Sequence, residues 1–238
     1  MKNFFVILGG MGTLATTNFL NDLNEAYKPN SDQENLNYMV LNHATIPDRT
    51  SFILKKSEEN PFDYLKEDIE SVDKLNPDFY VMTCNTAHFF YDDLQRLTKK
   101  PIINMIELVE NKLNNLKKPS TIGIFATEGT IKSKLFNNII EKCGHKALLS
   151  SKNTQENINA CLYSDVKEKG EINFDRYHKT LKAMMDEGAD YIIIGCTEAS
   201  FINSKDKESS SYPLIDSEKE LVDATLKLGP KLQKNIEI

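Results

Sequence analysis

Short runs of apolar residues alternate along the chain with segments in which apolar positions recur at helical spacing. In the segments 62–75, 106–116 and 174–184 the apolar residues repeat every three or four positions, which places them on one stripe of a helix. The short apolar runs are typical of buried strands: Phe4–Leu8, Tyr38–Asn42, Phe79–Thr83, Ile102–Ile103, Thr121–Phe125, Lys146–Ser150, Tyr191–Ile194 and Leu214–Ile215. Strands that alternate with such helices predict an α/β fold with parallel, helix-covered sheets.

The two halves of the chain repeat one pattern. Cys84 and Cys196 each follow, by six residues, an aspartate before an apolar strand, and each precedes by 17 positions a proline before a shorter strand. The segment 5–13 also resembles 122–130, because in both a strand leads to Gly-Thr. Three matches in the same order predict two pseudo-symmetric domains, each with a mostly parallel four-stranded sheet flanked by helices.

The expected division puts residues 1–104 and 212–238 in the first domain and residues 105–211 in the second. Within the last segment, Ser217–Leu228 is predicted to be a helix that packs back on the first half. The run 203–211 is rich in Ser, Lys and Asp and is predicted to be a polar loop.

Composition narrows the kind of protein. Of 238 residues, 40% are hydrophobic and 27% charged, and the net charge of −6 gives no electrostatic reason to expect a nucleic-acid or membrane partner. No apolar run approaches the roughly 18 residues of a membrane span, and Phe4–Leu8 is too short for a signal-peptide core. We therefore expect a soluble cytoplasmic protein. Its four widely spaced cysteines are expected to stay reduced, and no metal-binding cluster is predicted.

Two of the cysteines lie at predicted strand ends, where α/β sheets bind ligands. Cys84 precedes Asn-Thr and Cys196 precedes Thr-Glu, so a helix that starts there would lower the pKa of each thiol from about 8.5. Two thiols on opposite sides of a cleft suit racemisation, because one can remove the α-proton from one face while the other returns a proton to the opposite face.

Five segments carry a family resemblance: Gly9–Gly12, Pro47–Thr50, Cys84–His88, Ala126–Thr130 and Gly195–Glu198. In this order they resemble the signature segments of the aspartate/glutamate racemase family, and most closely its aspartate racemases, over nearly the whole chain. The resemblance implies two pseudo-symmetric α/β domains with the active site in the cleft between them. It also implies an acidic amino-acid substrate, with aspartate favoured and glutamate possible, and no pyridoxal phosphate or metal. A homodimer is the default expectation for such an enzyme.

Residue by residue, the resemblance makes Cys84 and Cys196 the catalytic pair. Arg49 and Lys167 would hold the side-chain carboxylate of the substrate, with Lys169 as an alternative because one extra residue precedes Gly170. His88 could support the first cysteine or, less plausibly, bind a metal. The implied substrate-binding residues are Met11, Gly12, Arg49, Asn85, Thr86, Thr127, Lys167, Thr197 and Glu198.

Two alternatives stay open at this point. The run Gly10–Ala15 fits a dinucleotide-binding fingerprint, but the second strand ends in Asn42-His43 where that fingerprint expects an acidic residue for the ribose. Within the resembled fold, related two-cysteine isomerases or decarboxylases act on hydantoins, maleate or malonates. Arg49 favours the acidic amino acid.

Overall fold

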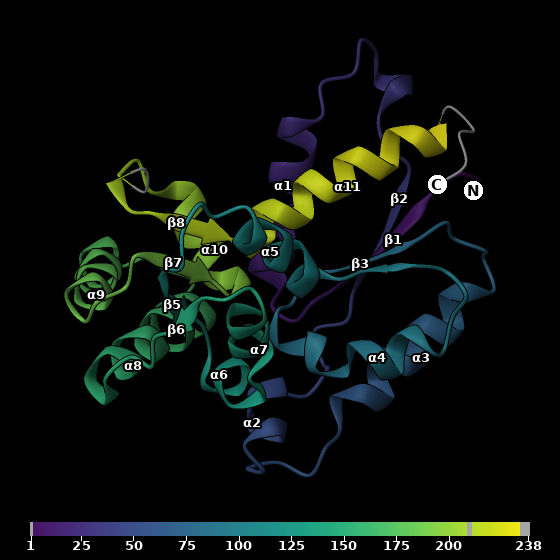
Figure 1. The fold of residues 1–238 in the computed structure, drawn as a ribbon. Helices are drawn as coiled ribbons and strands as arrows, with labels where there is room; N and C mark the ends of the chain where they lie inside the picture. The colour runs from purple at the N-terminus through teal and green to yellow at the C-terminus, as the bar shows by residue number, and fades with distance from the viewer. Residues whose placement is uncertain (1, 209–210, 234–238) are drawn as a thin grey trace.

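The computed structural model describes residues 2–208 and 211–233 and shows two halves, each built on its own sheet (Figure 1). All strands pair in parallel, in the orders β2-β1-β3-β4 and β6-β5-β7-β8, so the two sheets share one topology. The strands are β1 (Phe5–Gly9), β2 (Tyr38–Asn42), β3 (Tyr80–Met82), β4 (Ile102–Ile103), β5 (Thr121–Phe125), β6 (Lys146–Ala147), β7 (Tyr191–Ile194) and β8 (Leu214–Asp216). The predicted α/β fold with two four-stranded parallel sheets is confirmed.

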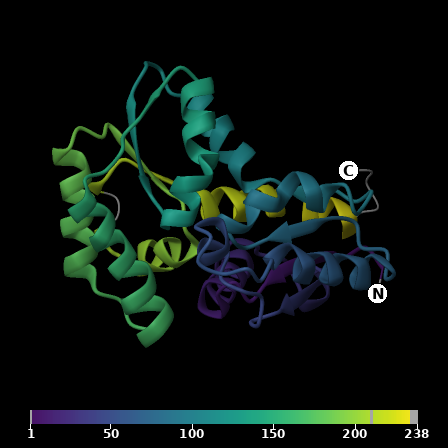
Figure 2. The ribbon, with the colours of Figure 1, turned by 90° about the horizontal axis from the view of Figure 1, so that it is seen from below.

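Helices cover both faces of the first sheet. On one face α1 (Thr13–Ala26) and α11 (Ser217–Gln233) pack their apolar residues against β1 and β3. On the other face α3 (Pro61–Asp73) and α4 (Tyr91–Gln95) form a second core, together with the short helix α2 (Arg49–Ile53) and the 3₁₀ helix Thr86–Phe90. Seen from below, α11 runs along this half (Figure 2).

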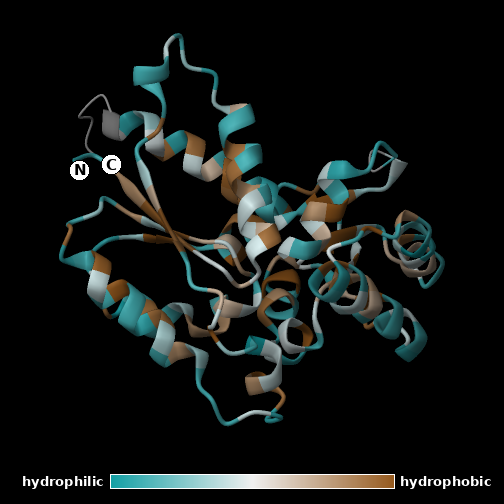
Figure 3. Cartoon of the chain, turned by 180° about the vertical axis from the view of Figure 1, so that it is seen from behind, coloured by the Kyte–Doolittle hydropathy of each residue, from teal (hydrophilic) through white to brown (hydrophobic). Residues whose placement is uncertain are grey.

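The second sheet is covered in the same way. One face packs against α5 (Met105–Asn114) and α7 (Leu135–Lys142). The other face packs against α8 (Lys152–Asn159), a π-helix (Ala160–Lys169), α9 (Phe174–Asp186) and α10 (Thr197–Lys205). A short helix, α6 (Glu128–Ser133), follows β5. Colouring by hydropathy shows the apolar residues gathered on the strands and on the helix faces turned toward them (Figure 3).

The chain crosses between the halves after β4 and again after β8. Strand β8 hydrogen-bonds to β7, so residues 214–216 belong to the second sheet, whereas α11 packs on the first. We therefore propose that the returning segment of the first domain begins at Ser217 rather than at residue 212. The predicted loop 203–211 starts later than expected, because α10 continues to Lys205. Residues 209 and 210 of that loop lie outside the described residues.

No helix in the described ranges, 2–208 and 211–233, is long and apolar enough to cross a membrane.

Candidate active site

Cys84 and Cys196 occupy equivalent places in the two halves. Each lies two residues beyond the carboxyl end of a central strand, β3 for Cys84 and β7 for Cys196. Both are buried, with exposed fractions of 5% and 4%. Their surroundings differ, because one residue separates Cys84 from a 3₁₀ helix whereas Cys196 directly precedes α10 as its N-cap residue.

Glu198 is the group that most directly contacts a thiol. The thiol of Cys196 donates a hydrogen bond to Glu198, with 2.8 Å between Sγ and Oε2. Burial raises the pKa of Cys196 well above its ordinary value, and the negative charge of Glu198 raises it further, while Lys167 opposes the rise. The expectation that the following helix would lower the pKa of this thiol is therefore wrong, because desolvation and the neighbouring carboxylate outweigh the helix terminus.

Lys167, and not Lys169, lies at the boundary between the halves. Its Nζ is 3.6 Å from Oε1 of Glu198 and 4.5 Å from the centre of the Tyr163 ring. Burial works against the charged form, but Glu198, Cys196 and Tyr163 together raise the pKa of Lys167, so it carries a positive charge. Lys169 is more exposed and lies 3.9 Å from Asp165, away from Glu198.

Arg49 supplies a second buried cation. It is the first residue of α2, whose N-terminus is capped by the Asp48 side chain. The guanidinium donates to the backbone carbonyls of Met11 at 2.6 Å, Pro47 at 2.9 Å and Ile46 at 3.0 Å, while its Nε has no partner. The ion pairs among the described residues leave Arg49 without a carboxylate. A buried positive charge held only by carbonyls favours an anionic ligand.

The turn after β1 brings the first half against the second. Gly10 has a φ of 86°, and a side chain there would collide with the backbone of His43. A Cβ added at Gly12 would lie 3.1 Å from Oε1 of Glu198, so the turn approaches the carboxylate closely. Met11 is buried, and its carbonyl is tied to Arg49.

Four threonine hydroxyls join the halves beside the cysteines. Oγ1 of Thr86 lies 2.9 Å from that of Thr130 and 3.2 Å from that of Thr127, and Thr50 donates to Thr127 at 3.1 Å. The hydroxyls of Thr86 and Thr127, both implied to bind substrate, are thus engaged with each other and with Thr130. Thr197 is fully buried at the start of α10.

Asn85 and His88 both follow Cys84, but only the His88 side chain has hydrogen-bond partners. Asn85 is buried, and neither its side-chain oxygen nor its nitrogen has a hydrogen-bond partner. His88 Nδ1 donates to the Cys84 carbonyl at 2.8 Å, and its Nε2 accepts from the backbone amide of Met105 at 3.0 Å. Burial lowers the pKa of His88 to about 4, so the ring is neutral. With both ring nitrogens bonded to backbone, His88 supports the Cys84 loop and has no free nitrogen for a metal.

A cavity of about 360 Å³ opens between the halves beside Arg49, Lys167 and Glu198. Its first-half wall is Gly10 to Ala15 with Ala44, Ile46, Asp48 and Arg49, and its second-half wall is Val166, Lys167 and Glu198. Two wall residues carry a buried atom with no hydrogen-bond partner, Arg49 Nε and Glu198 Oε1. Three more such atoms belong to Asn85, which follows Cys84 directly, and to Tyr163, whose ring contacts Lys167: Asn85 Oδ1, Asn85 Nδ2 and Tyr163 Oη. Buried polar atoms of this kind are usually paired, so their gathering here points to a polar ligand.

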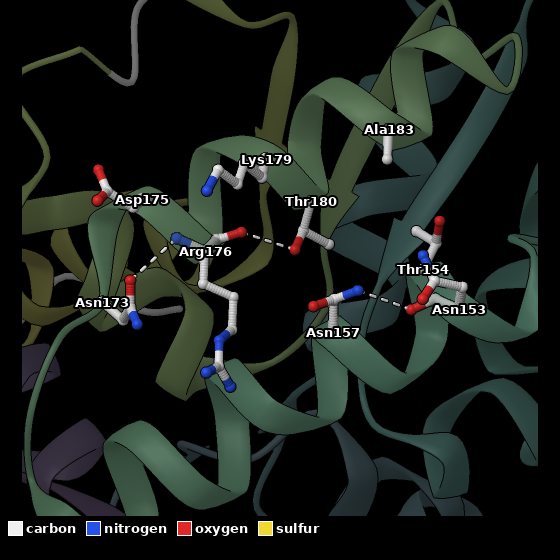
Figure 4. A pocket seen from close by; sticks show the side chains of 9 residues that line it. All are labelled: Asn153, Thr154, Asn157, Asn173, Asp175, Arg176, Lys179, Thr180 and Ala183. Carbon is white, nitrogen blue, oxygen red and sulfur yellow. Dashed lines mark hydrogen bonds between the residues drawn. The ribbon is translucent and has the colours of Figure 1, made fainter.

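Another hollow, between α8 and α9, lacks these features (Figure 4). Its polar side chains are bonded largely within their own helices: Asn157 donates to the Asn153 carbonyl, Thr180 to the Arg176 carbonyl, and Asn173 accepts from the Arg176 amide. Arg49, Lys167 and Glu198 are not among its lining residues.

Sequence reasoning singled out neither Tyr163 nor the two further threonines, Thr50 and Thr130. The threonines lie inside segments that carried the resemblance, so their hydroxyls could have been considered. Tyr163 had a weaker signal, its position four residues before Lys167 in a stretch for which no helix was predicted.

The comparisons with known proteins agree with this geometry. The family model for Asp/Glu/Hydantoin racemase matches residues 8–225. The broad specificity amino-acid racemase RacX of Bacillus subtilis is 24% identical over 226 residues, which cover 92% of this chain and 95% of that protein. Among solved structures, aspartate racemase of Picrophilus torridus superposes with a TM-score of 0.80 at 23% identity, over 95% of this chain and 94% of that one. Glutamate racemase of Francisella tularensis superposes with a TM-score of 0.68 at 18% identity, over 98% and 81%.

Parallel sheets repeated in two halves, with buried thiols at equivalent strand ends, define an isomerase of the racemase type. The chain belongs to the Asp/Glu/Hydantoin racemase family. This membership replaces the dinucleotide-binding interpretation of Gly10–Ala15.

Proposed function

We propose that this racemase interconverts the L and D forms of an acidic amino acid, with aspartate favoured and glutamate possible, through a thiol/thiolate pair formed by Cys84 and Cys196. The observation that carries the proposal is the set of unpartnered buried polar atoms on Asn85, which follows Cys84, on Glu198, which bonds to Cys196, and on Arg49 in the cavity wall. A ligand with two carboxylates and an ammonium group offers acceptors and donors for all three residues.

The charges of the cavity support an acidic substrate. Arg49 and Lys167 contribute two positive charges to the wall, and Asp48 and Glu198 two negative charges. Glu198 pairs with Lys167 and Asp48 caps α2, so Arg49 is the cation that keeps no carboxylate partner among the described residues and can bind a carboxylate of the substrate. We propose that Arg49 and Lys167 hold its side-chain carboxylate. Met11, Gly12, Asn85, Thr86, Thr127, Thr197 and Glu198 are proposed to surround its α-carboxylate and amine.

The hydrogen bond to Glu198 supports a proposal for the starting roles of the two thiols. Cys196 is held protonated because its pKa is raised, so Cys84 is proposed to act first as the thiolate. The Cys84 sulfur takes the α-proton, the electron pair stays on the α-carbon and its carboxylate, and Cys196 gives its proton to the opposite face. Product leaves with the proton on Cys84 and the charge on Cys196. Backbone amides and the Asn85 side chain are proposed to stabilise the carbanion.

Incubation of the protein in heavy water tests the activity and the substrate together. With L-aspartate or L-glutamate we expect the α-proton signal to disappear and the D-isomer to accumulate, as followed by NMR and chiral chromatography. Turnover of a hydantoin, maleate or a malonate without any change in amino acids would instead place the chain with the other two-cysteine enzymes.

We further propose that the enzyme works in the cytoplasm as a homodimer, without pyridoxal phosphate or metal. Two thiols and backbone donors suffice for this proton transfer, and a twofold dimer is the commonest assembly of soluble enzymes. Racemisation should therefore persist after treatment with a chelator, and light scattering on the purified protein should give twice the chain mass. Loss of activity on chelation would contradict the metal-free mechanism.

A further inference from the structure

The continuous helix formed by α8 and the π-helix carries two stripes with a spacing of four residues. Ile158, Leu162 and Val166 form the apolar stripe and lie in the core of the second half. The polar stripe lies beside it and consists of Gln155, Asn159, Tyr163 and Lys167. A repeat of four drifts around a regular α-helix of 3.6 residues per turn, but the wider turns of the π-helix keep it on one side.

Three members of the polar stripe bond to residues that follow strands β5 and β7. Gln155 donates to the Ala126 carbonyl at 3.0 Å, and Asn159 donates to the Glu128 carboxylate at 2.9 Å. Lys167 pairs with Glu198, at the far end. Tyr163 lies between these contacts on the stripe, yet its hydroxyl oxygen is buried and has no hydrogen-bond partner.

The polar groups that act on the Tyr163 hydroxyl belong to both halves of the molecule. Burial raises the pKa of Tyr163 to about 12, and Lys167 and Thr50 oppose the rise, while Asp48 and Cys196 add to it. Of the groups that shift the pKa of Tyr163, Asp48 and Thr50 belong to the first half, and Lys167 and Cys196 belong to the second. The hydroxyl is therefore a neutral donor at the boundary where Arg49 and Lys167 lie.

We propose that the Tyr163 hydroxyl donates a hydrogen bond to the side-chain carboxylate of the substrate, as a third contact beside Arg49 and Lys167. The inference rests on the proposed function and adds a specificity-determining residue to it. A carboxylate has about four lone-pair directions, so it can accept from two cations and a phenol together. Without such a ligand, the buried hydroxyl would lose the hydrogen bond that it makes with water in the unfolded chain.

Two other roles for Tyr163 lead to different measurements. If the hydroxyl closed onto Thr50 during turnover, it would act as a latch between the halves and change kcat rather than ligand affinity. If the ring alone mattered, as a platform under Lys167, removal of the hydroxyl would change nothing. The variant Tyr163→Phe separates these roles, because it removes one oxygen and keeps the ring.

The experiment measures two quantities in Tyr163→Phe: kcat/KM for aspartate racemisation, and the affinity for succinate, a dicarboxylate without an amine, by calorimetry. We expect both to fall about tenfold or more, since a hydrogen bond to a charged group is lost. Tyr177→Phe is the matched control. Tyr177 also has a buried, unpartnered hydroxyl, but it packs in the core of the second half against Phe125. Its variant should keep wild-type values in both assays.

The outcomes distinguish this inference from the proposed function. Wild-type values for Tyr163→Phe in both assays, or a loss of kcat with unchanged succinate affinity, would overturn the role of the hydroxyl. If the wild-type protein racemised no acidic amino acid but Tyr163→Phe still weakened succinate, the contact would stand and the proposed function would fail. Absence of succinate binding by the wild type would overturn both.

Discussion

At Asn85 a complete side-chain amide is buried with neither its oxygen nor its nitrogen bonded, directly after a cysteine. A buried polar group without a partner costs about 1–3 kcal/mol. Arg49 and Glu198 add further buried polar atoms without a hydrogen-bond partner. We expect a ligand with matching donors and acceptors to bind here and to supply the missing hydrogen bonds.

Arg49→Ala is predicted to reduce turnover of acidic amino acids strongly. Truncation of one partner of a buried, charge-assisted contact costs about 2–5 kcal/mol, which corresponds to a loss in kcat/KM of roughly 30-fold or more. Steady-state kinetics with aspartate and glutamate measure this loss. Arg96→Ala is the control, because Arg96 is exposed and pairs with Asp93 on the surface. Equal kinetics for the two variants would contradict the role of Arg49.

Cys84→Ser and Cys196→Ser are predicted to fail in complementary ways. A hydroxyl is a far weaker acid than a thiol with a pKa of about 8.5, so each variant should lose nearly all racemisation. Each should retain α-proton exchange with solvent on one face only, with preference for opposite enantiomers, as measured by NMR in heavy water.

The remaining cysteines provide the controls for that pair. Cys161 is buried in the second core with a pKa raised to about 12, and Cys143 ends α7, so Cys143→Ser and Cys161→Ser should racemise like the wild type. Substantial racemisation by either Cys84→Ser or Cys196→Ser, or the same enantiomer preference in both, would contradict a two-base mechanism.

At the scale of elements, the π-helix explains why the sequence could not decide whether Lys167 or Lys169 faces the substrate. The extra residue before Gly170 could be accommodated in a loop or within a helix, and a regular helical repeat does not distinguish the two. The structure places the wider turns at Ala160–Lys169 and points Lys167 toward Glu198. The spacing of four from Ile158 to Leu162 to Val166 was a usable signal, because a regular α-helix would favour a mixture of threes and fours.

The pKa of Cys196 shows another limit of sequence reasoning. The position of a thiol at a helix start is visible in the sequence, and it favours a lower pKa. The depth of burial and the contact with Glu198 depend on how two halves pack together, and here they have the larger effect. The residue types of the site could be predicted, but the sign of this electrostatic effect could not.

Thr127→Val is predicted to destabilise the junction of α2, α6 and the 3₁₀ helix. The Thr127 hydroxyl caps α6 by accepting from the Thr130 amide, and it also bonds to Thr50 and Thr86. Loss of a cap together with these buried bonds should lower the free energy of unfolding by about 1–3 kcal/mol. Urea denaturation measures the change, with Thr17→Val on the exposed face of α1 as the control. An effect no larger than that of the control would contradict the role of the cluster.

For the whole molecule, His88 predicts a dependence of stability on pH. Its pKa is about 4 in the folded protein and about 6.5 in an unfolded chain, so between these values the unfolded chain binds a proton that the folded chain does not. The contribution of His88 to stability is therefore present above pH 6.5 and is lost as the pH falls, by about 3 kcal/mol at pH 4.

The variant His88→Gln isolates that contribution, since other buried acids also titrate. Glutamine can donate to the Cys84 carbonyl and accept from the Met105 amide without taking up a proton. Urea unfolding between pH 7 and pH 4.5 should show a smaller loss of stability in His88→Gln than in the wild type. Parallel curves for the two proteins would show that His88 titrates equally in the folded and unfolded chains.

The overall architecture was predictable because buried parallel strands are short, apolar and bounded by polar turns. Four of the expected strands have the observed bounds, as at Tyr38–Asn42 and Thr121–Phe125, and the other four overlap the observed strands. The edge strand β6 is shorter than its apolar pattern suggested, since it pairs only at Lys146 and Ala147. The helix expected at Ser217–Leu228 returns to the first half as predicted, although α11 runs on to Gln233.

The two crossings give the molecule a reciprocal exchange of helices. Helix α5 follows the last strand of the first sheet but covers the second, and α11 follows the last strand of the second sheet but covers the first. Each half is thus completed by a helix that the other half supplies. If the repeat arose by gene fusion, the ancestor would have been a pair of identical short chains that exchanged their C-terminal helices. A fragment such as residues 1–116 would then lack α11, which packs beside α1 on one face of its sheet. We expect such a fragment to complete its core by exchanging C-terminal helices with a second copy of itself.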